Sequence, residues 1–335
     1  MTREPHPFAR FVNILGRGKT MTRSLTIDEA EEAMAMIIAG EVVPEQLGAF
    51  LMLLRVKEET SGEIAGFVRG ARAAMQLPTA LTRVDLDWSS YAGKRRQLPW
   101  FILAALALAG NGWRVFMHGA EGHTAGRVYT REALASLGLP IAGSLDEAAV
   151  HLAQHDFAYL PLERLSPQLA DMMDLRPILG LRSAVHTFAR MLNPFSAPCM
   201  LQGVFHPAYM EMHRGAGILL GQPHIAVFRG EGGEIERRPS KPCEVLTAHD
   251  GQQYEERWAP LLADPRLTPD EEMDLSRLGA MWRGEIHDDY AEAAITGTLA
   301  IALKALGAEP DMAAAQTRAV SLWQARDRSR LAAAA

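Results

Sequence analysis

The first 78 residues carry apolar side chains at helical spacing. Apolar positions recur three and four residues apart in stretches that begin after Thr26, at Pro44 and after Thr60. Thr26 and Thr60 are each followed three residues later by a glutamate, the capping-box pattern of a helix start, and Pro44 suits a first helical turn. This part is therefore predicted to be helical only, with short amphipathic helices whose apolar faces need partners.

After Pro78 the pattern changes, and apolar runs alternate with helical stretches. The strand candidates are Val84–Trp88, Arg114–Met117, Phe157–Leu162, Met200–Phe205, His224–Phe228 and Cys243–Ala248. The helices between them are Gln97–Ala109, Arg131–Leu137, Leu145–Gln154 and Ala208–Leu220, and a last helix is expected over Met312–Ala332. This alternation predicts the α/β fold class: a small all-helical N-terminal domain, and a larger α/β domain with a mainly parallel central sheet flanked by helices.

The loop after the first strand candidate, residues 89–96, is the most informative polar segment, and we call it the basic loop. A loop that leads a strand into a helix favours anions, because it presents backbone N–H groups and the positive end of the helix dipole. Nucleotide enzymes usually fill such a loop with glycines. Here one glycine, Gly93, precedes Lys94, Arg95 and Arg96. The loop indicates a phosphate site built for side-chain contact with a polyanion, or else an ordinary solvated basic turn.

Composition narrows the class of protein. The chain has 335 residues, 48% of them hydrophobic, enough for one large core or two domains. No apolar run approaches the ~18 residues that a bilayer crossing needs, so no membrane partner is expected. The N-terminus lacks a signal-peptide pattern. Two cysteines, Cys199 and Cys243, have no metal-ligand spacing, which favours a reduced, cytoplasmic protein without structural zinc.

The net charge of −6 taken alone argues against nucleic-acid binding, because dedicated binders are usually basic. The distribution of charge argues the other way. No acidic residue lies between Asp87 and Glu121, or between Asp174 and Glu211. Segregated charge can build a positive face on an acidic protein; the alternative is that these acid-free tracts are simply core.

Several segments of this chain, in order and spacing, resemble the anthranilate phosphoribosyltransferase family of the glycosyltransferase family 3 fold. The matching segments are Leu25–Met34, Gly40–Val42, Gln46–Thr60, Met117–Gly119, Leu179–Ser183, Asn193–Pro194 and Gly203–Pro207. The resemblance covers roughly residues 10 to 330.

The resemblance implies a helical small domain over residues 1–80, to which a second helical segment near 163–190 returns. Residues 81–162 and 191–335 would form the α/β domain. Proteins of this family are commonly homodimers through the small domain, so a homodimer through the N-terminal helices is expected. The family's reaction joins anthranilate to the ribose of phosphoribosyl pyrophosphate with magnesium, chemistry that depends on positioning and charge stabilisation.

Most motifs that serve this reaction depart from the family's pattern. The basic loop, with bulky Tyr91, replaces a Gly-Thr-Gly-Gly-Asp loop. The family's Lys-His-Gly-Asn reads Met-His-Gly-Ala over residues 117–120. The Asp-Glu pair that holds magnesium becomes Ile235 and Glu236, and one remaining carboxylate is a poor magnesium site. We therefore expect no metal and no cofactor, with magnesium needed only if the chain is a transferase.

Four family positions survive: His118, Gly119, Arg176 and Arg182. The resemblance places Arg176 at the anthranilate-binding arginine and Arg182 at the arginine of the family's Leu-Gly-x-Arg-Thr motif. Structural roles are the alternative, with Arg182 supporting the hinge and His118 bonded within the core. These positions are treated as vestiges, and no residue is assigned as catalytic.

Relative to the family's motifs, this chain has cations in the segments where acidic and amide residues are missing. Arg190 is the last residue of the segment that replaces the family's Asn-x-x-Gly-Pro. This pattern resembles the YbiB-type branch of the fold, understood to bind nucleic acid without sequence preference and without demonstrated transferase activity. We therefore expect DNA or RNA to bind through backbone phosphates, with Tyr91 stacking on unpaired bases or else lying in the core. The expected contact residues are Tyr91, Gly93, Lys94, Arg95, Arg96, Arg176 and Arg190. The alternative function is a phosphoribosyl- or glycosyltransferase acting on anthranilate or an unknown acceptor.

Overall fold

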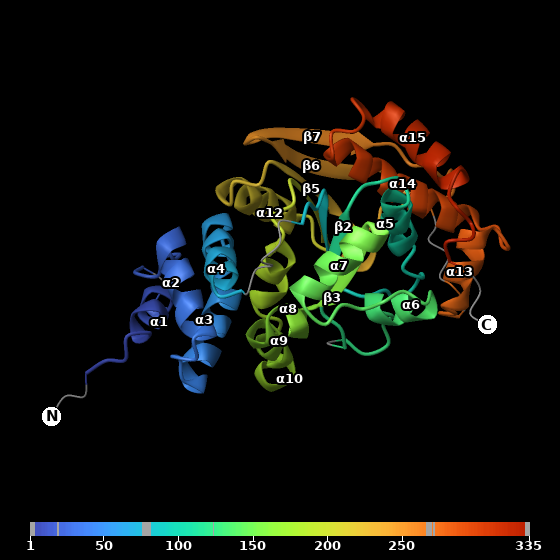
Figure 1. Ribbon diagram of the computed structural model, residues 1–335. Coiled ribbons are helices and arrows are strands. Elements are labelled where there is room, and N and C mark those ends of the chain that lie inside the picture. Colours follow the sequence, from blue (N-terminus) through green and yellow to red (C-terminus); the bar gives the residue numbers. More distant parts are fainter. Residues whose placement is uncertain are drawn as a thin grey trace.

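Four helices form the N-terminal part of the computed structural model, which describes residues 4–18, 20–75, 82–122, 124–265, 270 and 272–331. They are α1 (Ala9–Gly16), α2 (Ile27–Ile38), α3 (Pro44–Lys57) and α4 (Ser61–Ala73), and they stand to one side of the sheet (Figure 1). Both predicted capping boxes are confirmed: Thr26 starts α2 and Thr60 starts α4, each with reciprocal bonds to the glutamate three residues on. Pro78 and its neighbours lie outside the described residues.

The larger part is built on a seven-stranded sheet in the order β3-β2-β1-β4-β5-β6-β7. The strands are β1 (Leu86–Ser90), β2 (Val115–Gly119), β3 (Phe157–Pro161), β4 (Cys199–Val204), β5 (His224–Arg229), β6 (Cys243–His249) and β7 (Gln252–Trp258). The first five are parallel, and β6 and β7 are antiparallel. The predicted fold class is confirmed, and all six strand candidates are present.

The strand β7 was not predicted. It pairs with β6 through a two-residue turn in which Asp250 and Gly251 have positive φ values of 48° and 82°. An Asp-Gly pair in this conformation is a favoured hairpin turn. The strand itself is mostly exposed, so it lacks the buried apolar run by which the other strands were found.

Helices cover both faces of the sheet and create two cores (Figure 1). One face packs against α7 (Leu145–His155) and α12 (Ala208–Leu219), and that core continues into the N-terminal helices. The other face packs against α5 (Phe101–Ala109) and α14 (Asp289–Ala305). The second core is completed by α6 (Thr130–Ser136), α13 (Ser276–Arg283) and α15 (Met312–Gln324).

A run of short helices connects β3 to β4 and packs on the N-terminal helices. It consists of α8 (Leu162–Leu165), α9 (Pro167–Asp174), α10 (Arg176–Leu179), α11 (Val185–Phe188) and a 3₁₀ turn (Ala189–Met191). Phe188 reaches Phe67 of α4, with ring centroids 5.4 Å apart. We call residues 162–191 the connecting segment. The resemblance implied a helical segment near 163–190 that returns to the small domain, and the connecting segment lies there. The boundaries of the two domains stay a prediction.

Within the described part of the chain, no helix combines the length and the apolar character that a bilayer crossing requires.

Candidate functional site

The candidate site lies where the order of strands in the sheet reverses. From β1 the chain continues to β2 on one side, whereas β4 lies on the other side of β1 and continues to β5. At such a switch point the loops after the two central strands diverge and leave a crevice at the carboxyl edge. The loops that follow β1, β4 and β5 all contribute residues to a cavity at this crevice.

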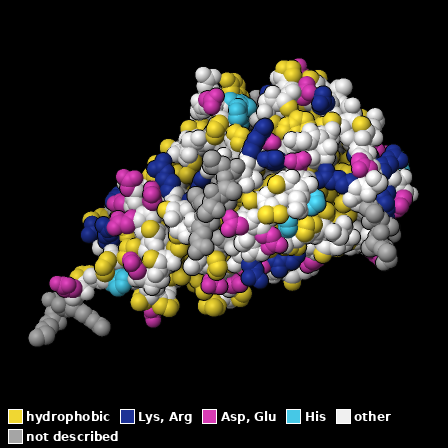
Figure 2. Space-filling model, in the orientation of Figure 1, with side chains coloured by type: hydrophobic (Ala, Val, Ile, Leu, Met, Phe, Trp, Pro, Cys, Tyr) yellow, Lys and Arg dark blue, Asp and Glu magenta, His cyan; other side chains and the backbone are white. Residues whose placement is uncertain are grey.

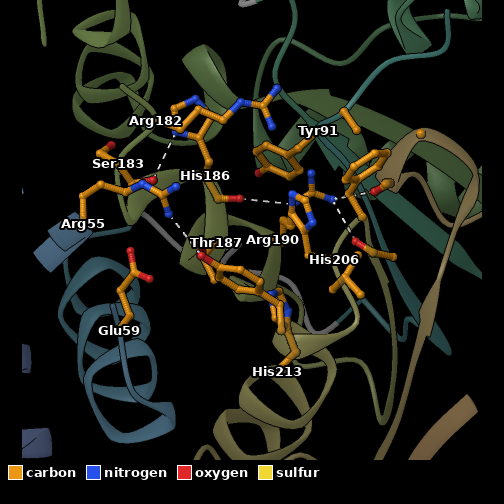
Figure 3. A pocket seen from close by; sticks show the side chains of 17 residues that line it. Arg55, Glu59, Tyr91, Arg182, Ser183, His186, Thr187, Arg190, His206 and His213 are labelled. Carbon is orange, nitrogen blue, oxygen red and sulfur yellow. Dashed lines mark hydrogen bonds between the residues drawn. The ribbon is translucent and has the colours of Figure 1, made fainter. Parts of the chain in front are cut away.

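This cavity has a volume of about 180 Å³ and is lined by residues of both the N-terminal helices and the α/β part. Arg55 of α3 donates to the hydroxyl of Tyr209 at 3.2 Å and so spans the two parts. Figure 3 shows the side chains around it; the wall includes Arg55, Glu59, Tyr91, Arg182, His186, Arg190, Phe205, His206 and Tyr209. Glu59 is buried, and burial raises the pKa of its carboxyl group. Cations and aromatic rings dominate this wall.

The backbone N–H groups at the start of the basic loop are already bonded to a carboxylate of the same chain. Oε1 of Glu234 accepts from the N–H of Ala92 at 2.5 Å and from the N–H of Gly93 at 2.6 Å. Glu234 has no exposed surface, and its second oxygen, Oε2, has no hydrogen-bond partner among the described residues. An internal carboxylate therefore occupies the position at which such a loop would bind an anion.

Lys94 belongs to the same internal arrangement. It is only 1% exposed and forms an ion pair with the fully buried Glu236. The other oxygen of Glu236 accepts from the N–H of Phe101 at 2.9 Å, at the start of α5. Burial raises the pKa of Glu236, and the charge of Lys94 opposes that shift. This placement differs from the expected contact between Lys94 and a ligand's phosphate, because its charge is neutralised inside the protein.

The capping of Phe101 also explains a difference in the helix that follows. The sequence pattern predicted that it begins at Gln97, whereas α5 begins at Phe101. The N–H of Leu98 bonds to the carboxylate of Asp270 at 2.8 Å, so the main chain at Leu98 is held by another segment and is not part of the helix.

Two arginines fasten the loops at the crevice to each other. Nη1 of Arg127 donates to the carbonyl groups of Ala92 at 2.7 Å and Gly93 at 3.1 Å. Nη1 of Arg190 donates to the carbonyl groups of Gly203 and Gly233, both at 3.2 Å. Arg190 thus lines the cavity, but several of its donors serve the main chain.

Tyr91 and His118 form a buried polar pair at the ends of β1 and β2. The Tyr91 hydroxyl lies 2.7 Å from Nδ1 of His118, whose Nε2 lies 3.4 Å from Oδ1 of Asp87. A carboxylate only accepts, so Nε2 is the donor toward Asp87, and in a neutral imidazole Nδ1 is then the acceptor for the Tyr91 hydroxyl. Burial, reinforced by the charge of Asp87, raises the pKa of Tyr91 well above its usual value. Tyr91 is 2% exposed, which argues against a role as an open stacking surface.

The two predicted glycines lie where backbone and rings come close. Gly93 has φ +67°, and a Cβ there would lie 2.8 Å from the ring of Tyr129. A Cβ at Gly119 would lie 1.9 Å from the carbonyl oxygen of Ser90. Both positions therefore require glycine for packing.

Arg176 and Arg182 are brought together at the edge of the crevice. Both donate to the hydroxyl of Thr124, at 2.9 Å and 3.3 Å. Loss of hydration, and then repulsion from Arg176, Arg127 and Arg190, lowers the pKa of Arg182 to about 10. No described carboxylate forms an ion pair with Arg182. Excess positive charge at one point is the property of an anion site.

Arg95 and Arg96 are exposed, and neither forms an ion pair with a described residue. They do not line the cavity. The structure thus separates the predicted residues. Tyr91, Arg182 and Arg190 line the cavity, and Arg182 meets Arg176 at Thr124. Lys94 is internal, whereas Arg95 and Arg96 face solvent.

The residues at the family's magnesium position do not fit that ion. Ile235 and Glu236 are fully buried, and Glu236 is held by Lys94. Glu231 is paired with Arg238 at 2.7 Å. No group of three potential metal ligands exists within the described ranges.

Sequence reasoning missed the residues that close the loop, above all Glu234 and Arg127. Glu234 lies two residues before Glu236, the carboxylate that remains of the family's magnesium pair. No linear pattern shows that Glu234 contacts a loop 142 residues earlier in the chain. Thr124, the hydroxyl shared by two arginines, gave no signal.

Comparisons with known proteins agree with this fold. Residues 11–75 match the family model described as "Glycosyl transferase family, helical bundle domain". An anthranilate phosphoribosyltransferase of Oleidesulfovibrio alaskensis is 33% identical over 228 residues, which are 67% of this chain and 68% of that protein. The uncharacterized protein YbiB of Escherichia coli is 28% identical over 207 residues, 61% of this chain and 64% of the other.

Among solved structures, the anthranilate phosphoribosyltransferase of Thermus thermophilus superposes with a TM-score of 0.79 at 20% identity, covering 95% of this chain and 94% of the other. Fold, segment order and sequence identity therefore agree: the chain belongs to the anthranilate phosphoribosyltransferase-like family of the glycosyltransferase family 3 fold.

Proposed function

We propose that the chain is a pentosyltransferase whose anionic acceptor binds at Arg176 and Arg182. The observation that carries the proposal is the convergence of these two guanidinium groups on Thr124, beside a cavity at the switch point of the sheet. Guanidinium groups bind carboxylates and phosphates with paired, charge-assisted hydrogen bonds. Repulsion among the arginines is relieved when an anion binds between them.

Family membership supports the reaction class. Two relatives, 33% and 31% identical to this chain, are named anthranilate phosphoribosyltransferases, so the reaction proposed is transfer of a phosphoribosyl group to anthranilate or to another small anionic acceptor. Such transfer depends on orientation of the two substrates and stabilisation of the leaving group's charge, and it requires no covalent nucleophile. The chain departs from the family at the binding position of the phosphoribosyl donor. There, Glu234 and Glu236 accept hydrogen bonds from the protein's own main chain.

The test is turnover of phosphoribosyl pyrophosphate with anthranilate and magnesium, measured as the release of pyrophosphate. Loss of a charge-assisted contact costs roughly 1.5–3 kcal/mol, so Arg182→Ala should lower kcat/KM by about 10- to 100-fold. Arg95→Ala, a change at an exposed arginine outside the cavity, is the matched control and should leave kcat/KM unchanged. Absence of turnover, together with no calorimetric binding of either substrate, contradicts the proposal.

A second candidate function is binding of DNA or RNA backbones without sequence preference, and one observation favours it. Arg95 and Arg96 are exposed, adjacent and outside any ion pair with a described residue, so both are available to phosphates. On the face drawn in Figure 2, however, Lys and Arg side chains are scattered among acidic ones and do not form a continuous track.

A gel shift with single- and double-stranded oligonucleotides at two salt concentrations tests this candidate. Each cation that contacts a phosphate contributes roughly one unit to the slope of log affinity against log salt. The double variant Arg95→Ala with Arg96→Ala should therefore lower that slope by about 2. Unchanged affinity in the double variant removes this surface from consideration.

A further inference from the structure

We propose that Glu234 is an internal competitor that controls access of phosphate groups to the N–H pair of Ala92 and Gly93. The proposal does not depend on the transferase reaction, because it concerns occupancy of one anion position. That position is formed by two adjacent N–H groups that point at the same carboxylate oxygen, at 2.5 Å and 2.6 Å.

The main chain around Glu234 is shaped for this contact. A Cβ at Gly230 would lie 1.6 Å from the Glu234 carbonyl oxygen, and a Cβ at Gly203 would lie 2.5 Å from the same atom. Both glycines therefore allow residues 230–236 to lie directly against the end of β4. Nη1 of Arg190 joins the same two segments, because it donates to the carbonyl groups of Gly203 and Gly233, both at 3.2 Å.

The N–H groups of Ala92 and Gly93 cannot bind Glu234 and a phosphate at the same time. Each backbone N–H has one proton to donate, and both protons are used by Oε1 of Glu234. A phosphate oxygen at this position would also meet the second oxygen of Glu234, which has no hydrogen-bond partner among the described residues. Like charges in a site shielded from water repel strongly. A phosphate can therefore bind here only when the Glu234 side chain has moved away.

A purely structural role for Glu234 makes a different prediction. If the carboxylate only stabilised the loop, its removal would lower stability and create no ligand site. If it competes with phosphate, its removal leaves the N–H groups of Ala92 and Gly93 without their acceptor, and phosphate affinity rises.

The experiment titrates the full-length protein with inorganic pyrophosphate in a calorimeter. Glu234→Ala should bind at least ten times more tightly than the unmodified protein. Glu234→Gln removes the charge but keeps an oxygen at the N–H pair, so its gain should be smaller, about threefold. Glu231→Gln, a change at a carboxylate of the same segment that is paired with Arg238, is the matched control and should leave affinity unchanged.

An NMR titration shows where pyrophosphate binds. In Glu234→Ala, the amide signals of Ala92 and Gly93 should shift in an NMR titration with pyrophosphate. Folded Glu234→Ala that binds pyrophosphate no more tightly than the unmodified protein overturns the proposal. If that variant does not fold, folded Glu234→Gln with unchanged affinity overturns it equally. Loss of transferase turnover leaves these affinities untouched, so the two proposals fail separately.

Discussion

At the scale of single residues, neighbouring charges of this protein serve different purposes. Lys94 is 1% exposed and paired with Glu236, whereas Arg95 beside it is exposed. Removing one partner of a buried pair leaves an uncompensated charge and costs roughly 3–5 kcal/mol. An exposed charge with no ion pair contributes little to stability.

We therefore expect Lys94→Met to lower the free energy of unfolding by about 3–5 kcal/mol, while Arg95→Met changes it by less than about 0.5 kcal/mol. Urea unfolding followed by circular dichroism measures both. Equal midpoints for the two variants would show that the Lys94–Glu236 pair is not buried in solution.

His213 provides a prediction for pH. Burial, together with the nearby charge of Arg190, lowers its pKa from 6.5 to about 3. The unfolded chain then binds a proton between these two values that the folded chain does not, so the stabilisation is complete above pH 6.5 and is lost as pH falls toward 3. This one group should reduce the free energy of unfolding by up to about 1.4 kcal/mol per pH unit in that window. His213→Gln should show a shallower pH dependence, whereas the same change at exposed His155 should not.

At the scale of elements, contact between α2 and α4 depends on glycine. A Cβ at Gly66 would lie 2.3 Å from the carbonyl oxygen of Ile27, and a Cβ at Gly70 would lie 2.5 Å from that of Glu31. Gly48 in α3 is different, because a Cβ there would meet only a methyl group of Leu179 at an ordinary 3.7 Å. Intrinsic helix propensity favours alanine at all three positions.

The two sites should therefore respond with opposite sign to the same substitution. Gly66→Ala should destabilise the protein by about 1–3 kcal/mol, because overpacking exceeds the gain in propensity. Gly48→Ala should be neutral or stabilising by up to about 1 kcal/mol. Thermal unfolding of both variants checks this, and stabilisation by Gly66→Ala would mean that the two helices are farther apart than described.

At the scale of the whole molecule, helix α3 of the N-terminal part and helix α10 of the connecting segment each leave an apolar side chain on the surface. Val56 of α3 is 80% exposed, and Ile178 of α10 is 79% exposed. The two helices are neighbours, since Gly48 of α3 faces Leu179 of α10. An apolar surface of this kind is typical of contacts between proteins.

We propose that this surface joins two copies of the chain, as the family resemblance implies. Sedimentation at micromolar concentration should then give a dimer, and Val56→Glu should give a folded monomer, because a charge at the centre of an apolar contact loses its hydration. The same change at Val150, which is 52% exposed on α7, should leave the mass unchanged. An unmodified protein that sediments as a monomer contradicts the proposal.

The sequence predicted the elements better than it predicted the site. Capping boxes at Thr26 and Thr60 and the apolar strand runs are signals within short stretches of sequence, and the two capping boxes form between residues only three positions apart. The hairpin strand β7 was not predicted, because it is mostly exposed and has no apolar run. The basic loop was found, but the separate roles of Lys94 and Arg95 were not, since adjacent residues point in different directions only once the loop is packed.

By itself, the sequence determined the kind and order of most helices and strands, the α/β class and the family, because these follow from spacing, capping and order along the chain. Only the tertiary structure decided which charges are available to a ligand. Glu234 and Glu236 reach the basic loop and the start of α5 from 142 and 135 residues away, and no linear pattern records such a contact. The physical reason is burial: a charge next to a distant partner inside the protein is neutralised, while its neighbour in solvent stays free to bind.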